Sequence, residues 1–492
     1  MKIKKIIYPL SLLLLTIGCD SYLDTELQGT YTTETFFKTQ NQAISALNAT
    51  YQIATFNTTN NILWAFGDVA SDDTVKGGND GDQSDISFIN NFTANPDNGA
   101  VEAFWKHYYA GIARANDVIY YVPNIAMDET IKARIIAEAK FLRAYYYFHL
   151  TNVYGKIPLR LLPALNINDL SFPLSEVNVI YTQIEKDLTD ASIVLPRTYP
   201  ASETGRATKG AAFGLLSKVY LFQGKWASSL LAVTEVEKIG YSLSPVFRNN
   251  FEVATENNLE SIFEIQHLAA QIPATGSFLN QYFSPNVVGG YFFNAPTQNF
   301  VNEFEITSNN VVDPRLDYTV GRFGNNWVDG QAFMSNWSPS TGFLDKKMAQ
   351  PLSKTPIGDG GLNYVFMRYA EILLIKAETL NELNRGAEAL TPLNKIRKRA
   401  RESYLFDNKL AGFGTMPALL LPDVTDTNQS SLRTAIRHER RVELGLEFHR
   451  FYDLMRYGKA AAEQALGNVG FNYETNRYFP IPQSEKDSNS KI

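Results

Sequence analysis

Apolar residues recur every three or four positions through much of the first half of the chain, which is the spacing of one helix face. This spacing predicts helices within residues 36–56, 104–122 and 177–194. A further helix should begin after Asp128, whose side chain can cap the first turn, and should end before Gly155. The first half is therefore predicted to be mostly α-helical.

A helical hairpin is predicted where five residues match the first half of a tetratricopeptide unit. These residues are Phe213, Leu216, Tyr220, Gly224 and Trp226, with Gly224 at the turn. A weaker copy begins near Leu373, between helices expected at 367–383 and 390–401. Because no regular repeat period is visible, the pattern predicts scattered helical pairs and not a continuous solenoid.

Two stretches break this helical pattern. Residues 67–99 are rich in Gly, Asp and Asn and are expected to be mostly loop. Residues 240–365 are rich in Gly, Pro, Asn and aromatic residues, with one alternating segment at 261–266 that predicts a short strand. Long irregular segments in compact chains tend to be functional. We therefore expect a mostly α fold with minor β, in which a helical scaffold, roughly 30–240 and 365–460, presents a loop-rich binding region.

The N-terminus has the features of a lipoprotein signal. Positive residues from Lys2 to Lys5 precede a short apolar run, and Leu-Thr-Ile-Gly leads into Cys19, the one cysteine of the chain. The sequence predicts a signal peptide at 1–18, a lipidated Cys19 and a single mature domain at 19–492; a free thiol after an ordinary signal is the alternative. Since no later segment is long and apolar enough to span a bilayer, we expect anchoring to a membrane without crossing it.

Composition narrows the choice of ligand. The net charge is −6 and no basic tract is present, which argues against nucleic acid as a partner. Aromatic residues make up 13% of the chain, and aromatic rings flanked by Asn and Asp suit contact with sugars. The candidate ligand-binding residues are Trp64, Tyr291, Trp327 and Trp337, with Asp72 and Asp73 beside the first. The alternative for each ring is a place in the hydrophobic core.

Carboxylates at helical spacing raise the question of catalysis. Glu439, Glu443 and Glu447 repeat within a long helix expected at 431–458, and a glycosidase also uses two carboxylates. Arginines interleave, however, and Arg450 lies three residues from Glu447 and from Asp453, as Arg456 does from Asp453. A carboxylate paired with arginine has a lowered pKa and is a poor general acid. We therefore expect these residues to be structural.

Metal and cofactor chemistry finds little support in the sequence. The five histidines include no pair at metal-ligand spacing with a carboxylate, and no phosphate-binding loop is present. Asp68, Asp72, Asp73, Asp80, Asp82 and Asp85 form a dense acidic stretch. An EF-hand beginning at Asp80 would need Gly and Glu where Asp85 and Asn91 stand. We predict no cofactor and no catalytic metal, and leave an irregular structural calcium site open.

Several stretches, taken in order, resemble the SusD/RagB family of Bacteroidetes outer-membrane nutrient-binding lipoproteins. The stretches are the lipobox at Cys19 with Tyr22-Leu23-Asp24, then 138–148, 154–159, 206–212, 368–374, 394–397, 439–444 and 450–456. Their order and spacing together are specific, although no single string is decisive.

The resemblance implies a non-catalytic lipoprotein on the cell surface. It implies tetratricopeptide-like helical pairs, an irregular ligand-binding region, and a place as the lid of a SusC-like TonB-dependent transporter in the outer membrane. The nutrient would be an oligosaccharide or a peptide, and no ligand-binding residue is transferred by motif. The competing hypotheses are a helical adaptor that binds only protein and a secreted glycosidase.

Overall fold

The computed structural model describes residues 36–166, 170–328, 330–351 and 358–492. The predicted signal peptide and Cys19 lie outside these ranges. The described chain is mostly helical, and its strands pair only in twos, which confirms the expected mostly α fold with minor β. Across the described ranges, no helix is long and apolar enough to cross a membrane.

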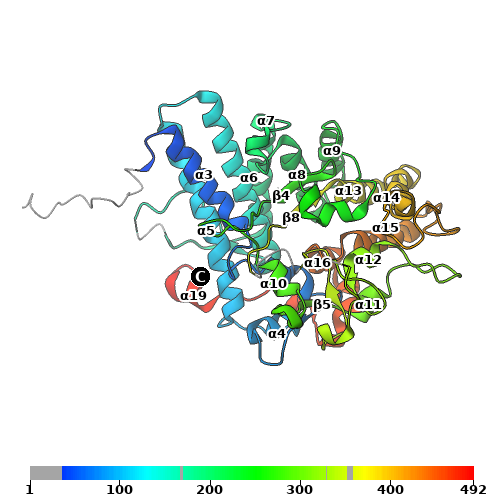
Figure 1. Ribbon diagram of the computed structural model, residues 1–492. Helices are drawn as coiled ribbons and strands as arrows, with labels where there is room; N and C mark the ends of the chain where they lie inside the picture. Colours follow the sequence, from blue (N-terminus) through cyan, green and yellow to red (C-terminus); the bar gives the residue numbers. More distant parts are fainter. Residues whose placement is uncertain (1–35, 167–169, 329, 352–357) are drawn as a thin grey trace, which may run out of the picture.

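The four helices predicted in the first half are present. They are α3 (Gln40–Ala54), α5 (Gly99–Tyr121), α6 (Glu129–Tyr154) and α7 (Val177–Val194). The Asp128 carboxylate accepts the backbone N–H of Ile131 and so caps α6, which ends at Gly155 with φ +72°. The second half of α6 is buried on every side, and it packs against α3, α5 and α7 (Figure 1).

Two helical pairs continue this scaffold, as the tetratricopeptide pattern predicted. The first pair is α8 (Lys209–Phe222) and α9 (Trp226–Glu237), and the second is α13 (Tyr369–Glu382) and α14 (Gly386–Phe406). Gly224 makes the first turn at φ +67°, a conformation that glycine adopts without strain. Because α13 packs against both α8 and α9, the two pairs form one continuous helical body.

The prediction of one long helix at 431–458 is wrong, because the chain forms two helices there. α15 (Gln429–Leu444) and α16 (Arg450–Tyr457) are separated by a bend in which Leu446 and Phe448 have positive φ. The Phe448 backbone lies so close to Gly67 that a Cβ at residue 67 would be 2.4 Å from the Phe448 carbonyl oxygen. This tertiary contact stabilises the bend, and helical spacing alone does not reveal it.

The strands occupy the irregular regions. The expected strand is β4 (Ser261–Ile265), which pairs with β8 (Tyr364–Arg368) in antiparallel register. A second pair joins β1 (Thr74–Gly77) to β5 (Phe293–Pro296), far apart in sequence. Two minor pairs are β2 (Ile157–Pro158) with β3 (Leu174–Ser175), and β6 (Val320–Gly321) with β7 (Leu344–Asp345).

The expectation of loop at 67–99 is only partly right. This interval includes most of the π-helical turn η2 (Ala65–Val69), the strand β1, and α4 (Ser84–Asn90). The remaining short helices are α10 (Leu279–Phe283), α11 (Gln298–Val301), α12 (Arg315–Thr319), α17 (Lys459–Leu466), α18 (Tyr473–Asn476) and α19 (Gln483–Ser488). The 3-10 turns are η3 (Val122–Asn124), η5 (Ala201–Glu203), η6 (Phe247–Phe251), η7 (Val253–Thr255), η8 (Asn286–Val288), η9 (Ser335–Trp337) and η10 (Gly467–Val469). Several of these short elements, with β5, gather beside the helical body (Figure 1).

Candidate functional site

The four candidate aromatic residues differ sharply in exposure. The side chains of Trp64, Trp327 and Trp337 are buried, at 1%, 2% and 8% relative exposure, whereas Tyr291 is 43% exposed. A ring that stacks on a sugar must offer one free face. The alternative of a place in the hydrophobic core is therefore correct for the three tryptophans, and Tyr291 is the candidate ring that solvent reaches.

Trp327 and Trp337 belong to a small hydrophobic core of their own. Both rings contact Phe333, with ring centroids 6.0 and 5.3 Å away, and they meet each other edge to face at 6.4 Å. Leu344 on β7 completes the packing. Their polar sequence neighbours belong to the tight turns around this core, because the backbone N–H of Trp327 donates to the carbonyl of Gln331 at 2.7 Å. Polar flanks thus indicate turns here and not exposed rings.

Trp64 has a different role, because it is the buried end of a group of rings that leads to Tyr291. Trp64 stacks on Phe293 at a centroid distance of 5.9 Å, and Phe293 lies 6.2 Å from Tyr282 and 5.8 Å from Tyr291. Tyr291 also contacts Tyr282, at 6.1 Å. We call these four residues the aromatic ladder. Three of its rings are buried and packed, so they hold the exposed fourth ring in place.

Glycines at the end of β1 let a neighbouring loop lie directly against the ladder. A Cβ at Gly77 would be 2.2 Å from the carbonyl oxygen of Phe292, and one at Gly78 would be 2.3 Å from the ring of Phe293. Both glycines have positive φ, and so does Phe292. The Lys76 ammonium lies 5.9 Å from the centroid of the Phe293 ring, in the range of a cation–π contact. The 78–83 loop therefore borders the ladder.

The ladder residues Tyr282, Tyr291 and Phe293 belong to a stretch without charge. Residues 268–302 include no Asp, Glu, Lys, Arg or His, although 20% of the chain is charged. The sequence interpretation overlooked Tyr282 and Phe293, and this uncharged stretch is the signal that could have found them. Its Asn, Gln, Ser and Thr side chains can donate and accept hydrogen bonds without a charge.

The two candidate acids, Asp72 and Asp73, face arginines. Asp72 accepts a bidentate pair of hydrogen bonds from Arg450, at 2.7 and 2.9 Å, and Asp73 accepts one from Arg441 at 2.7 Å. Burial raises the pKa of Asp72, but the hydrogen bonds and charge of Arg450, with the charge of Arg441, outweigh it, so the net pKa is lowered. For Asp73 burial dominates and the pKa is raised. Ligand binding by either acid stays a prediction.

The charged residues of α15 form a buried ion-pair network, but mostly not with the expected partners. Arg368 on β8 donates to Glu443 at 2.5 Å, to Glu447 at 2.7 and 2.9 Å, and to Glu260 at 2.9 Å. Glu443 also pairs with Arg399 and with Arg315. We define this network as Arg368 with Glu260, Glu443, Glu447 and the cations that share them, Arg315, Lys347 and Arg399.

Two of the three predicted pairs within the helix are wrong. Arg450 pairs with Asp72 and not with Glu447, because the bend before Arg450 removes the helical spacing between them. Asp453 lies in α16 with Arg450, but its two oxygens accept from Arg440 and Arg456 instead. Asp453 does pair with Arg456, at 2.7 Å. Burial raises the pKa of Glu443, but the nearby arginines outweigh it and hold the pKa far below its ordinary value. The expectation that such a carboxylate is a poor general acid is therefore confirmed.

Metal-ligating geometry occurs once among the described residues. Glu305, His438 and Glu439 bring one possible ligand atom each within 4.8 Å of one another. Glu305 already pairs with Arg397 at 2.7 Å, and Glu439 with Arg315 at 2.6 Å, so both carboxylates are neutralised by arginine. No three carboxylates of the acidic stretch come together in this way within the described ranges, so it carries no calcium proposal.

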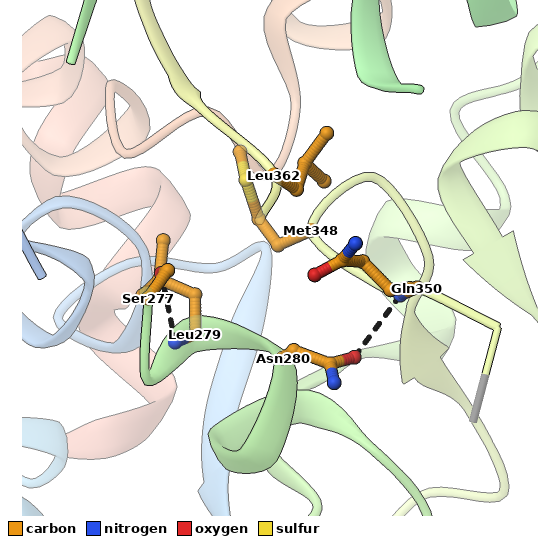
Figure 2. A pocket seen from close by; sticks show the side chains of 6 residues that line it. All are labelled: Ser277, Leu279, Asn280, Met348, Gln350 and Leu362. Carbon is orange, nitrogen blue, oxygen red and sulfur yellow. Dashed lines mark hydrogen bonds between the residues drawn. The ribbon is translucent and has the colours of Figure 1, made fainter. Parts of the chain in front are cut away.

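A narrow pocket lies between α10 and the segment around Gln350 (Figure 2). Asn280 accepts the backbone N–H of Gln350 at 3.0 Å, and the Ser277 hydroxyl accepts that of Leu279 at 3.1 Å. The pocket has essentially no room for a water molecule, whereas ligand pockets typically enclose roughly 300–1,000 Å³. The pocket therefore does not suit an oligosaccharide.

Family models match most of the chain. A model described as the SusD family matches residues 259–492, and one described as starch-binding associating with outer membrane matches residues 21–221. SusD-like protein P2 of Formosa agariphila is 28% identical over 98% of this chain and 97% of its own. SusD-like protein P25 of the same organism is 25% identical over 93% and 90%.

Solved structures share the fold over the same length. A laminarin-binding SusD-like protein has 29% identity and a TM-score of 0.76, covering 92% of this chain and 98% of its own. A SusD-like carbohydrate-binding protein from Bacteroides fragilis has 25% identity and a TM-score of 0.78, covering 93% and 100%. Surface glycan-binding protein A from Bacteroides fluxus has 25% identity and a TM-score of 0.73, covering 92% and 98%.

The helical pairs, the irregular region between them and these matches define one class of protein. The chain belongs to the SusD/RagB family, as the resemblance in the sequence predicted. Members of this family are non-catalytic binding proteins, so the chain is not an enzyme. The arginine-paired carboxylates of α15 agree with that conclusion.

Proposed function

We propose that this chain is a surface lipoprotein that binds an oligosaccharide at the exposed end of the aromatic ladder and delivers it to a SusC-like TonB-dependent transporter. The observation that carries the proposal is Tyr291, a solvent-exposed ring held by three buried rings beside an uncharged, hydrogen-bonding stretch. The laminarin-binding and glycan-binding relatives support a glycan as the ligand.

The ladder suits a sugar for simple physical reasons. A sugar ring has apolar C–H faces edged by hydroxyl groups, and an aromatic ring can stack on such a face. Tyr291 is exposed enough to do so, and its packing against Tyr282 and Phe293 reduces the entropy lost on binding. An extended glycan does not need a deep cavity, which agrees with the small size of the pocket under α10.

Calorimetric titration with a panel of neutral glycans tests the proposal. Tyr291→Ala should weaken binding about five-fold or more, because a lost stacking ring costs on the order of 1–3 kcal/mol on the scale of base–aromatic stacking and about 1.4 kcal/mol is tenfold in affinity. The matched control is Tyr120→Ala on α5, which removes a ring of similar exposure, 40%, away from the ladder. The melting temperature should change little in either variant.

Two outcomes contradict this proposal in different ways. If Tyr291→Ala binds the glycan like the wild type, the platform lies elsewhere on the surface. If the protein binds a peptide or another protein but no free glycan, it is an adaptor or a peptide-binding member of the family.

The proposed partner is a transporter of the SusC type. A lid that stays on a transporter should bury more than roughly 2,000 Å² in a stable complex. An affinity pull-down of the native lipoprotein in mild detergent should therefore recover a β-barrel protein near one to one. Recovery of the lipoprotein alone in several detergents would argue against the partnership.

The proposed anchor is a lipid on Cys19. Diacylglycerol with an N-acyl chain supplies more than one hydrocarbon anchor, which is enough for stable attachment to the outer membrane. Cells that express the wild type should incorporate labelled palmitate into the protein, whereas Cys19→Ala should lose the label and leave the membrane fraction. Equal labelling of both forms would contradict the anchor.

A further inference from the structure

We infer that the site at the ladder selects neutral glycans and discriminates against glycans that carry carboxylate or sulfate groups. This inference rests on the proposed function and adds the chemical class of the ligand. Three features of the described residues support it: the uncharged stretch, the hydrogen bonds that already engage Lys76 beside the ladder, and the acidic loop at the border of the site.

The uncharged stretch removes the residues that bind anions. Arginine forks and lysine ammonium groups are the side chains that recognise carboxylate, phosphate and sulfate. None occurs in residues 268–302, which form α10, η8, β5 and α11 and supply three of the four ladder rings. In a chain with 45 lysines and arginines, this side of the site offers only neutral hydrogen-bonding groups.

Among the residues that the structure describes, Lys76 is the cation that lies over a ladder ring, and its charge is already engaged. Its ammonium donates to the backbone carbonyl oxygens of Asn79, at 3.1 Å, and Asp82, at 2.6 Å. It also lies over the Phe293 ring. Binding a glycan anion would require Lys76 to leave contacts that hold the 78–83 loop closed, so this lysine stabilises the loop more than it attracts a ligand.

The loop itself adds negative charge at the border of the site. Asp80 and Asp82 are exposed, and both lie close enough to Lys76 that their charges raise its pKa, although partial burial lowers the pKa overall. Two carboxylates against one lysine leave a net negative rim. An anionic glycan would be repelled over a Debye length of about 10 Å at 0.1 M salt, whereas hydroxyl groups would not be.

The experiment compares neutral glucans with sulfated forms of the same glucans. Laminarin and maltooligosaccharides serve as the neutral probes, and their sulfate esters as the anionic probes. By calorimetry at low salt, a neutral glucan should bind at least about ten-fold more tightly than its sulfated form, which is a difference of about 1.4 kcal/mol. The difference should shrink at about 1 M salt, where the Debye length is about 3 Å.

A charge reversal in the loop tests the role of the rim. Asp80→Lys should reduce the ratio of the affinities for neutral and sulfated glucan several-fold at low salt. The affinity for the neutral form should not change. Asp487→Lys is the matched control, because Asp487 is an exposed acid on α19, which Figure 1 places well apart from β5. This control should leave the difference unchanged.

The outcomes separate this inference from the proposed function. If sulfated and neutral glucans bind equally, or the sulfated form binds better, the selectivity is wrong while glycan binding stands. If Asp80→Lys and Asp487→Lys behave alike, the rim does not cause the selectivity. If no glycan of either class binds, the proposed function fails and the inference fails with it.

Discussion

The ion-pair network around Arg368 and the uncharged stretch at 268–302 use opposite chemistry within one fold. In the network, Glu443 and Arg368 are 0% and 1% exposed, and each has several partners of opposite charge. In the uncharged stretch, the side chains are aromatic, aliphatic or neutral polar, and the ring of Tyr291 is exposed to solvent. The comparison teaches that this protein uses its charges to hold the scaffold and its neutral groups to present a surface.

The physical cost of burying charge explains this division. A buried ion pair loses its hydration and roughly breaks even against apolar packing, so its main contribution is to fix which elements meet. Arg368 on β8 joins the bend after α15 to the segment before β4, because it binds Glu447, Glu443 and Glu260 together. A neutral ligand needs no such compensation, so the proposed binding surface at the ladder can do without charge.

Arg368→Ala should have the largest effect on stability. The substitution leaves three buried carboxylates short of their shared cation, and removal of one partner of a buried pair costs about 3–5 kcal/mol. We expect the free energy of unfolding, measured by urea denaturation, to fall by at least that amount. Arg368→Lys should recover only part of it, since one ammonium cannot reproduce the guanidinium contacts.

Arg385→Ala is the control for this prediction. Arg385 is exposed and pairs with Glu388 across one turn of α14, at 2.6 Å. Exposed pairs of this kind contribute little to stability, so the urea midpoint should stay within error of the wild type. A similar loss of stability in both variants would show that the buried network is no more important than a surface pair.

Trp327→Ala should have the next largest effect, again on stability and not on binding. The ring is 2% exposed and packs on Phe333, Trp337 and Gly321, where a Cβ would lie 2.6 Å from the indole. Truncation of a buried tryptophan costs about 3–5 kcal/mol. Urea denaturation should show this loss while glycan affinity, measured well below melting, stays unchanged. A lost affinity with full stability would return Trp327 to the binding site.

Local signals in the sequence predicted much of the scaffold. The α7 bounds match the expected 177–194, and Asp128 caps α6 as its position indicated. The break between α15 and α16 could not be predicted in this way, because it depends on the contact between Gly67 and Phe448, which are distant in sequence. The pairing of β1 with β5 is equally non-local.

The site was harder to predict than the fold. Tyr291 was a candidate in the sequence, and the structure shows that its ring is exposed, but Trp327 and Trp337 are core residues of a small satellite cluster. Polar residues beside an aromatic residue in the sequence indicate that the backbone forms a turn there. They do not indicate whether the aromatic side chain points to solvent or to the core. The absence of charge from 268–302 is visible in the sequence and would have drawn attention to the ladder, where the binding site is proposed.

Asp345 is one of the buried carboxylates that form no ion pair among the described residues, as are Asp68 and Glu264, and it should make stability depend on pH. Burial raises the pKa of Asp345 to about 7, although one of its oxygens accepts the backbone N–H groups of Lys347 and Met348 and the other accepts the Asn294 amide, at 3.1 Å. The same amide reaches the buried Asp68 carboxylate, at 3.4 Å, whose pKa is also raised by burial. Asn294 directly follows the ladder residue Phe293 in β5, so the amide that binds both acids is next to the ladder in the chain.

The sign of the pH effect follows from the raised pKa. The folded state holds the Asp345 proton more tightly than the unfolded state, so stability should fall as pH rises from about 4 to about 7 and then level off. Relative to Asp345→Asn, the free energy of unfolding of the wild type should fall by about 4 kcal/mol across this window, since the pKa is raised from 3.8 to about 7 and one pKa unit is worth about 1.4 kcal/mol. Urea denaturation of both proteins from pH 4 to pH 8 measures the difference.

Asp453→Asn is the control, because the pH dependence of stability that Asp453 causes should have the opposite sign. Burial raises the pKa of Asp453, but Arg440 and Arg456 outweigh it and lower the net pKa, so its contribution should be lost only as pH falls below the ordinary range of a carboxyl group. If the free energies of unfolding of the wild type and Asp345→Asn differ by a constant amount from pH 4 to pH 8, Asp345 is not buried as a neutral acid.

Arg450→Ala should have the smallest effect, and it probes the border between the two regions. Arg450 joins α16 to the segment before β1 through Asp72, and both side chains are about one-eighth exposed, at 13% and 12%. Asp72 keeps Arg441, at 3.0 Å, so we expect a loss of about 1–2 kcal/mol, between the values of exposed and buried pairs. A double-mutant cycle with Asp72→Ala isolates the contribution of the pair to the free energy of unfolding, and the glycan affinity of Arg450→Ala should equal that of the wild type because the Arg450 side chain binds Asp72 and not the ligand. A fall in affinity without a fall in stability would mean that charge contributes directly to binding, and the contrast between the charged scaffold and the neutral site would then be wrong.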